Sequence, residues 1–428
     1  ASNMLEPLLD KAARELGIDR VELRKINAPG NGGKDAKYGP KQGPVTSAYL
    51  KEALEKGKKE FEWDKRSKYS GKRVGNKVKA IGVGQAYHTA GYNGFDGLCR
   101  ITPDGILHIH TGVGNLGTFS YASTSRVCAE VLGYDWERCV IERGGTRKHI
   151  PFNIGQFGSN TTFTMSRTNY AAGMAAKDLL LEIGAKVLGG KAENYKLENE
   201  FVVNTSNGSN KISFADCAKK AIEMGGKYSG METPEDINPF TKTAVGGIKG
   251  TGLVGVAKDK IPKTATVPAL SASFIEIELD LETGKYEILD CLGVADCGTV
   301  MHPTGLAAQI RSGAVMGFGL AATERHVYDP AYGRPNMKGF YQAKPPSYLD
   351  VPVKNGWAAV DKADPQSPVG AKGIGEPLQG SASSALLCAI SEALGGHMFN
   401  RTPVVTDMII NAAAGKPQSH KPMQTNCQ

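Results

Sequence analysis

Gly370-Ala371-Lys372-Gly373-Ile374-Gly375-Glu376-Pro377 is the stretch on which our interpretation of the fold depends. Gly373 and Gly375 leave the backbone bare enough to press against a bulky ligand. The small residues that follow predict a helix over 381–394, with Gly395 as its stop signal. Glu376 would then lie just before a helix N-terminus, whose partial positive charge favours the carboxylate, while burial favours the acid. A carboxyl held between these influences can serve as a general base, and an ordinary loop glutamate is the alternative.

Composition narrows the class of protein. A chain of 428 residues is long enough for two or three domains. No apolar run reaches membrane-spanning length, and residues 1–10 lack the pattern of a signal peptide. Eight cysteines without a close C-x-x-C pair argue against a disulfide framework and a zinc site. The net charge of +8 comes largely from lysines within 51–79, which we interpret as a solvated face. We therefore expect a cytoplasmic protein with reduced thiols, no nucleic-acid partner and no membrane span.

Helical and alternating patterns succeed one another along the chain. Apolar residues at helical spacing predict an opening amphipathic helix over 4–16, whose apolar face needs something to lie against. A helix is also predicted over 45–56, stopped at Gly57. Alternation predicts strands over 78–84, 97–102, 106–111, 274–280 and 286–296. A Pro-Asp-Gly turn joins the second of these strands to the third. Residues 190–265 carry few motifs. This mixture predicts an α+β, multidomain fold.

The segment Gly112-Val113-Gly114-Asn115-Leu116-Gly117 has the G-x-G-x-x-G spacing of dinucleotide-binding turns. A predicted strand precedes it and a predicted helix over 118–132 follows, and Glu142 could supply the acid that such a unit needs. The preceding strand follows a hairpin, however, and no βαβ series continues. Two hypotheses stay open. One is a nucleotide-dependent dehydrogenase that uses Gly112, Gly114 and Gly117, and the other is a glycine turn against a different phosphate-bearing cofactor.

Two further segments resemble binding elements. Residues 151–162 form a polar glycine loop before a long alanine-rich helix predicted over 165–188, and hydroxyls and backbone N–H groups at such an entrance suit an anion. His302-Pro303 opens a helix through Gly319 whose Gly and Ala residues leave one face thin, so that another backbone or a flat ligand can approach. The eight histidines do not assemble into a ligand set, so we predict no protein ligand to a metal.

Together these segments resemble the molybdenum-cofactor-binding subunit of the xanthine oxidase family of molybdenum hydroxylases. Residues 111–133 resemble that family's T-G-x-x-x-x-G-Q-G segment and its helix. Gly158-Ser159-x-x-Thr162 resembles its second cofactor loop, and residues 302–319 resemble its N-P to G-x-G helix. Gly373-Ile374-Gly375-Glu376 matches the most specific motif, G-x-G-E. The resemblance covers nearly the whole chain, with four motifs in the family's order.

The resemblance implies a buried molybdopterin cofactor, in its cytosine dinucleotide form, and names the residues around it. Glu376 would be the catalytic base in hydroxylating an aromatic N-heterocycle or aldehyde with water-derived oxygen. Electrons would leave through [2Fe–2S] clusters and FAD on partner subunits, because no cysteine spacing here suits a cluster. A hydratase, dehydrogenase or reductase variant of the family and a non-catalytic assembly subunit are the alternatives. The cofactor contacts implied are Leu116, Gly117, Thr118, Phe119, Gln156, Phe157, Gly158, Ser159, Thr161, Thr162, Gln309, Gly373 and Gly375.

Two departures from the family pattern affect what carries over. Gly117-Thr118-Phe119 stands where the family has G-Q-G, which shortens a glutamine and replaces a glycine by an aromatic residue. Residues 1–30 resemble the segment after the family's R-x-P-G region, so the preceding half is expected on another polypeptide. The chain then reads as the C-terminal portion of a split or processed molybdenum subunit. Residues 1–75 would complete a first molybdopterin-binding domain and residues 76–428 would form a second.

Overall fold

The computed structural model describes residues 1–30 and 44–417, which form two compact units. Unit 1 consists of Ala1–Thr89, Pro268–Lys362 and the chain from Ile374 onward, and unit 2 consists of Ala90–Val267 and Ala363–Gly373. The division between units therefore falls inside the Gly370–Pro377 segment. The fold is α+β, as predicted. The predicted domain boundary at 75/76 is not a point where the chain passes between these units, and it stays a prediction.

Unit 1 is built on a five-stranded sheet in the order β1-β2-β10-β11-β12. Strands β2, β10 and β11 are antiparallel neighbours, and β12 joins β11 in parallel. The alternating patterns predicted the three long strands, although β2 and β10 extend further than expected. The strands are β1 (Arg73–Val74), β2 (Lys77–Thr89), β10 (Pro268–Asp280), β11 (Tyr286–Asp296) and β12 (Asn355–Ala359).

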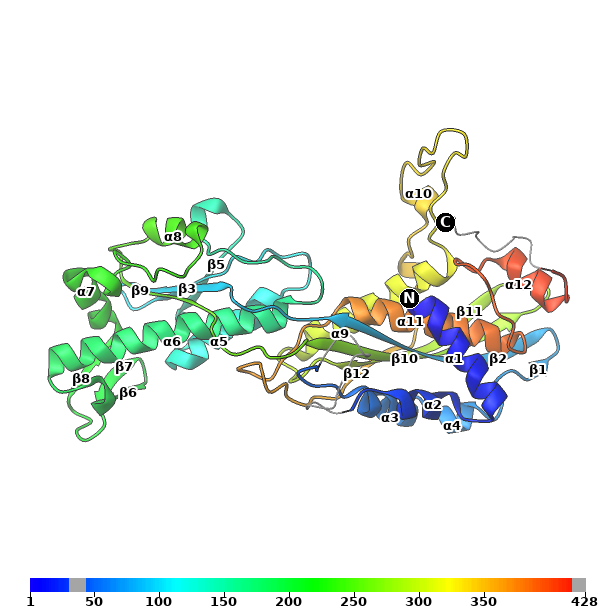
Figure 1. Cartoon of the computed structure of the whole chain (residues 1–428), viewed down its shortest axis with the longest axis horizontal. Coiled ribbons are helices and arrows are strands. Elements are labelled where there is room, and N and C mark those ends of the chain that lie inside the picture. The colour runs from blue at the N-terminus through cyan, green and yellow to red at the C-terminus, as the bar shows by residue number, and fades with distance from the viewer. Residues whose placement is uncertain (31–43, 418–428) are drawn as a thin grey trace. The chain divides into compact units, whose positions relative to one another are not determined.

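Helices cover both faces of this sheet (Figure 1). One apolar core lies between the sheet and α9 and α11, and a second lies between the sheet and α2, α3 and α4. The helices of unit 1 are α1 (Ser2–Leu16), α2 (Arg20–Asn27), α3 (Leu50–Glu60), α4 (Trp63–Arg66), α9 (Pro303–Ala322), α10 (Phe340–Ala343), α11 (Glu376–Ala393) and α12 (Thr406–Ala413).

The predicted helix stop at Gly57 is wrong, because α3 continues to Glu60. A Cβ atom at Gly57 would lie 2.0 Å from a ring carbon of Phe274 on β10. Glycine is therefore present because the helix packs directly on an aromatic ring of the sheet, and not because the helix ends there.

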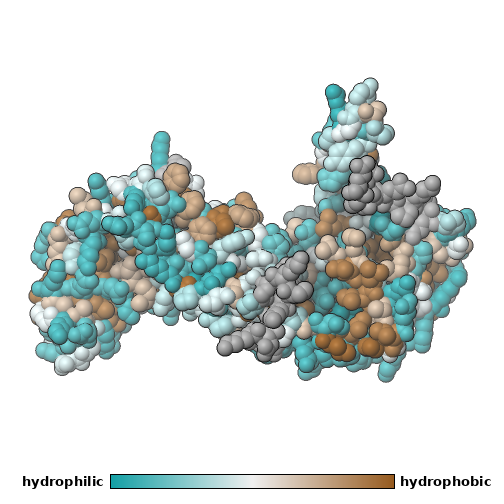
Figure 2. Space-filling view, in the orientation of Figure 1, coloured by the Kyte–Doolittle hydropathy of each residue, from teal (hydrophilic) through white to brown (hydrophobic). Residues whose placement is uncertain are grey.

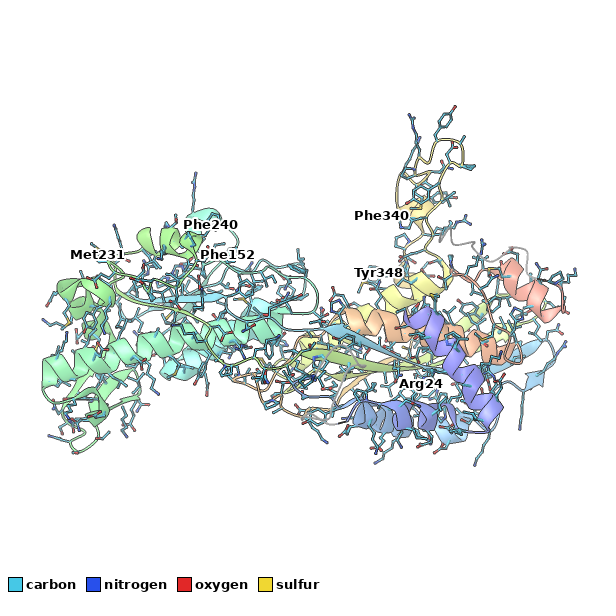
Figure 3. The ribbon with its side chains drawn as sticks, in the orientation of Figure 1. Arg24, Phe152, Met231, Phe240, Phe340 and Tyr348 are labelled. Atoms are coloured by element: carbon cyan, nitrogen blue, oxygen red, sulfur yellow. The ribbon has the colours of Figure 1, made fainter. Side chains whose placement is uncertain are left out.

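Helix α1 carries its apolar residues on the outside. Its buried side contains Glu6 and Asp10, which form ion pairs of 2.7 Å each with the fully buried Arg24 of α2 (Figure 3). Its large apolar side chains Met4, Leu5, Leu8 and Leu16 are exposed, and hydrophobic surface gathers over this helix (Figure 2). The uncovered apolar face expected from the sequence is therefore present, although the interior side is ionic.

Unit 2 contains a four-stranded sheet in the order β5-β4-β3-β9, with α5 and α6 packed on one face. Strands β4 and β5 are parallel, so β4, α5 and β5 form one βαβ unit. The weakly patterned region 190–265 supplies a small second sheet, two helices and β9. The elements are β3 (Asp96–Ile101), β4 (Leu107–His110), α5 (Ser120–Leu132), β5 (Cys139–Glu142), α6 (Thr161–Leu188), β6 (Tyr195–Glu198), β7 (Phe201–Asn204), β8 (Lys211–Ser213), α7 (Phe214–Met224), α8 (Pro239–Gly246) and β9 (Leu253–Lys258).

Candidate cofactor and catalytic site

The loop between β4 and α5 is held in place by its own side chains. The Oδ1 atom of Asn115 accepts hydrogen bonds of 3.1 Å from the backbone N–H groups of Gly117 and Phe119. Phe119 adopts the left-handed conformation with φ of 54°, which is uncommon for an aromatic residue. The side chains of Leu116 and Phe119 are exposed. The backbone of this loop is therefore fixed while two apolar side chains face outward.

Gln156 joins the two loops that the sequence predicted separately. Its Oε1 accepts a hydrogen bond from the backbone N–H of Leu116. Its Nε2 donates to the hydroxyls of Thr118 at 2.5 Å and of Ser120 at 2.7 Å. The structure thus brings Leu116, Thr118 and Gln156 together within unit 2. It also places a glutamine amide beside Thr118, the position where the resembled family carries a glutamine of its own.

Helices α5 and α6 begin directly after these loops without a side-chain cap. Phe119 and Asn160, the residues before them, make no capping hydrogen bond, whereas Ser213 and Asn238 cap α7 and α8 in the same unit. At α5 the Ser120 N–H donates to the Thr118 hydroxyl at 3.4 Å. The first turn of α6 presents backbone N–H groups and partial positive charge. The buried Oδ1 of Asn160 has no hydrogen-bond partner among the described residues. These features fit a ligand that carries phosphate and hydrogen-bond donors.

Gly373 contacts the second loop. Its N–H donates to the carbonyl of Ala90 at 3.2 Å, and a Cβ atom in its place would lie 1.4 Å from the carbonyl oxygen of Ser159. The sequence predicted that this glycine makes room for a bulky ligand. The structure changes the reason, because the neighbour is the Ser159 backbone, itself part of a predicted cofactor loop.

Arg167, a residue that the sequence analysis missed, holds the segment before the motif. It is fully buried on α6 and pairs with Asp259 at 2.7 Å. It also donates to the carbonyl of Gln366 at 2.6 Å and to that of Ile261. Its neighbours in sequence are the polar residues Ser166, Thr168 and Asn169. No clear signal of its burial was therefore visible in the sequence. Its partners lie 92 and 199 residues away in sequence, so its role needed the tertiary structure.

Glu376 is the first residue of α11, which begins five residues earlier than predicted. Pro377 occupies the first turn, where its missing N–H is tolerated. The helix ends at Ala393, and Gly395 follows in the left-handed conformation with φ of 65°, so the predicted stop is confirmed. Glu376 is exposed. The burial expected to favour its protonated form is therefore absent from this chain as described.

The thin face of α9 lies against the start of α11, as the small residues suggested. A Cβ atom at Gly313 would lie 2.8 Å from the Cβ of Leu378 and 3.2 Å from the carbonyl of Gly375. A Cβ atom at Gly317 would lie 2.6 Å from the carbonyl oxygen of Gln379. Gln309 lies one turn before Gly313 on the same face of the helix. In unit 1 the structure thus brings Gly375, the residue before Glu376, against α9.

The Glu142 carboxylate, which a dinucleotide-binding unit would need, is already engaged. Its oxygens contact Nδ1 of His108 at 3.0 Å and Nζ of Lys148 at 2.8 Å. Burial acts to raise the pKa of Glu142, but the hydrogen bonds from Lys148 and His108 outweigh it and lower this pKa. The sheet of unit 2 has β4 and β5 as its parallel pair, so the βαβ series of a Rossmann fold does not develop. These contacts do not favour the dehydrogenase hypothesis.

Histidines and cysteines occupy structural positions in the described ranges. His110 is buried, with its Nδ1 2.9 Å from the carbonyl of Lys148. Across residues 1–30 and 44–417, no cluster of three His, Cys, Asp or Glu side chains could hold a metal ion. The seven cysteines in these ranges are free thiols. No helix within them is long and apolar enough to cross a membrane.

The two joined loops and the helix starts behind them have features that suit an anionic cofactor, and comparison with known proteins identifies the class of protein. Residues 56–352 match the family described as the molybdopterin cofactor-binding domain. The chain belongs to this family.

Relatives of known name support this membership. The putative xanthine dehydrogenase molybdenum-binding subunit of Escherichia coli K12 is 26% identical over 400 residues, covering 91% of this chain and 49% of the relative. The 6-hydroxypseudooxynicotine dehydrogenase complex subunit gamma of Paenarthrobacter nicotinovorans is 26% identical over 424 residues, covering 96% and 50%. The chain therefore spans about half the length of these relatives.

Solved structures share the fold. The Cu,Mo-CO dehydrogenase matches with a TM-score of 0.77 at 19% identity, over 97% of this chain and 51% of that one. Quinoline 2-oxidoreductase from Pseudomonas putida 86 matches with a TM-score of 0.75 at 20% identity, over 97% and 52%. At these identities the likeness concerns the fold alone.

Proposed function

We propose that this chain is the C-terminal portion of the catalytic subunit of a molybdenum hydroxylase that acts on an aromatic N-heterocycle or an aldehyde. The cofactor is molybdopterin, in its cytosine dinucleotide form, and Glu376 is the catalytic base. The resemblance of Gly373-Ile374-Gly375-Glu376 to the family's G-x-G-E motif supports this role, as does family membership.

The contact of Gly373 with Ser159 is the observation that carries the proposal. Gly373 is the residue of this motif at which unit 2 ends, and it contacts a predicted cofactor loop. Glu376 follows three residues later, and three residues span at most roughly 11 Å of chain. Covalent connection alone therefore keeps the carboxyl within reach of that loop.

The residues present fit the cofactor, and each has a distinct task. The uncapped ends of α5 and α6, with Thr161 and Thr162, would hold its phosphate groups. The Gln156 amide would keep both loops in position, and Leu116 and Phe119 would exclude water from the bound group. The bound cofactor supplies the redox centre that takes two electrons from the substrate. Glu376 accepts a proton at a carboxylate oxygen during that step.

Partner polypeptides complete the proposed enzyme. The exposed apolar residues of α1 support an obligate partner, the subunit that carries the N-terminal half of the molybdenum region. Cover from such a partner would also bury Glu376. Further subunits would carry the [2Fe–2S] clusters and FAD, because cluster-binding cysteine spacing is absent from this sequence. Free thiols agree with the cytoplasmic setting that we propose.

The test of the catalytic role is Glu376→Gln in the intact complex. We expect molybdenum content near native and turnover per molybdenum atom at least ~100-fold lower, the usual scale for a positioned general base. Glu282→Gln, at an exposed turn of unit 1, is the matched control and should change neither quantity. A Glu376→Gln complex that loses molybdenum while each loaded centre turns over normally would show a structural glutamate instead.

Metal and substrate analysis tests the class of reaction. The native complex should contain molybdenum near one per copy, with cytidine nucleotide released on hydrolysis of the cofactor. Bound nicotinamide without molybdenum would refute the proposal. Steady-state rates with purines, pyridines, aldehydes and cyclic enones would then separate hydroxylation of a heterocycle from aldehyde oxidation and from hydration.

A further inference from the structure

Residues 325–353, here called the arm, expose a concentration of large apolar side chains. The arm stands away from the rest of unit 1 in Figure 1, and Phe340 and Tyr348 are labelled on it in Figure 3. Several large apolar side chains exposed on one segment mark an interaction site. Six side chains have exposed fractions from 79% to 100%: Tyr332, Phe340, Tyr341, Tyr348, Leu349 and Val353.

The backbone of the arm is nevertheless ordered by its own hydrogen bonds. Asp329 N–H donates to the Arg334 carbonyl at 2.9 Å, closing a turn. The Asp350 carboxylate accepts from the N–H and hydroxyl of Ser347 at 2.6 and 2.8 Å. The Thr323 hydroxyl donates to the Lys344 carbonyl at 2.8 Å, which joins the arm to the end of α9. The exposed side chains are thus presented by a preorganised backbone, which lowers the entropic cost of binding a partner.

The charges of the arm indicate the character of its partner. Arg325, Arg334 and Lys338 make no salt bridge with any residue that the structure describes. Lys344 lies over the ring of Tyr341 at 4.8 Å. Two copies of the arm facing each other would bring these cations together, which is unfavourable. An apolar groove with an acidic rim is the complementary surface.

The size of the exposed set suits a stable interface. Buried aromatic side chains contribute roughly 150–250 Å² each. The four aromatic residues among the six therefore offer roughly 600–1,000 Å², comparable to the roughly 800 Å² that each partner buries in a standard interface.

We propose that the arm docks into an acidic-rimmed apolar groove on the polypeptide that supplies the other half of the molybdenum subunit. The relatives that this chain matches carry about as much chain again as the part it spans. The similarity therefore indicates that this unmatched half is the partner bound by the arm. The inference rests on the partner named in the proposed function, but it assigns the contact to a specific segment.

The test is the triple variant Phe340→Ser, Tyr348→Ser and Leu349→Ser, co-expressed with the partner subunits. Because these side chains contact solvent, whatever variant complex does form should keep the native circular dichroism spectrum and melting temperature. Recovery of the complex should fall at least ten-fold. The matched control changes three exposed apolar residues elsewhere, Val74→Ser, Met231→Ser and Phe240→Ser, and should assemble normally.

Cross-linking mass spectrometry of the native complex identifies the occupant. Lys338 and Lys344 should link to acidic residues of the partner polypeptide. Links between arms of two copies, or native recovery of the triple variant, would overturn the proposal. A complex that assembles through the arm but contains no molybdenum would instead refute the proposed function and leave the docking surface standing.

Discussion

The two units hold their ends of the Gly370–Pro377 segment by different kinds of contact. In unit 1, glycines of α9 let α11 approach so closely that backbone atoms of the two helices are in contact. In unit 2, a buried arginine holds the incoming loop through backbone carbonyls and an aspartate. The first anchor consists of van der Waals contacts, and the second consists of charge-assisted hydrogen bonds.

The difference follows from the local backbone. Helix α11 satisfies its own interior hydrogen bonds, so an apolar neighbour suffices to locate it. Residues 363–373 form an irregular loop whose carbonyls need donors from elsewhere, and an arginine supplies up to five in a fixed geometry. The Gly370–Pro377 segment is thus held in unit 1 by close packing and in unit 2 by polar contacts, and different substitutions should disrupt each.

Arg167→Met should have the largest effect. It leaves the buried Asp259 carboxylate without its partner, and breaking a buried pair in this way costs about 3–5 kcal/mol. Hydrogen exchange of residues 363–373 in the complex should become fast, with loss of bound molybdenum. Arg126→Met, the same change at an exposed position of α5, is the control. Unchanged hydrogen-exchange protection of residues 363–373 would show that Arg167 does not hold this loop.

Gly313→Ala should have an intermediate effect on unit 1. The added methyl group meets the Cβ of Leu378 at 2.8 Å, so the start of α11 must shift. Overpacking of this kind costs about 1–3 kcal/mol. Turnover per molybdenum should fall while protection of residues 363–373 is retained. Ser312→Ala, on the exposed side of α9, should change neither quantity. If both units lost hydrogen-exchange protection equally, the α9–α11 contact and the Arg167 contacts would not act separately.

Acidification should have the smallest effect, and it should act on unit 2. Burial lowers the pKa of His110 to about 4, below its value of 6.5 outside the fold. The contribution of the neutral His110 imidazole to the free energy of unfolding is therefore complete above pH 6.5 and is lost as the pH falls toward 4. The loss at pH 5.5 should be about 1 kcal/mol. Glu142 remains ionised in this window, because its pKa is lowered below 4.5.

Hydrogen exchange at pH 7 and pH 5.5 measures this effect in each unit. Unit 2 should lose protection at the lower pH, and His110→Asn should abolish most of the difference. The contacts of Gly313 and Gly317 contain no titratable group, so the α9 and α11 contact should not respond. An equal pH dependence in the His110→Asn chain would show that other groups cause it.

Local patterns predicted most of the regular elements. Alternating residues over 274–296 predicted β10 and β11, and helical periodicity predicted α1. The small residues of α9 and α11 indicated a close helix contact, which Gly313 and Gly317 make. These predictions succeed because each depends on neighbours within a few turns or a strand length, where side-chain spacing dictates the buried face.

Predictions that depended on distant contacts were less complete. Gly57 was interpreted as a stop, although it accommodates the ring of Phe274 more than two hundred residues away. The sequence analysis set Glu376 between the influences of a helix N-terminus and of burial, and the structure shows an exposed side chain. Periodicity could not show that α1 turns Glu6 and Asp10 inward, because their partner Arg24 lies on another helix.

The sequence by itself determined the three long strands of unit 1, helices α1, α5, α6, α9 and α11, the glycine loops and the motif that ends in Glu376, because dihedral freedom and side-chain period are local properties. Only the tertiary structure decided that unit 2 is inserted into unit 1 and that Gln156 meets Thr118. It alone also showed that Arg167 holds the loop before the Gly370–Pro377 segment. These contacts join residues far apart in the chain, and their free energy depends on which surfaces meet when the whole chain is compact.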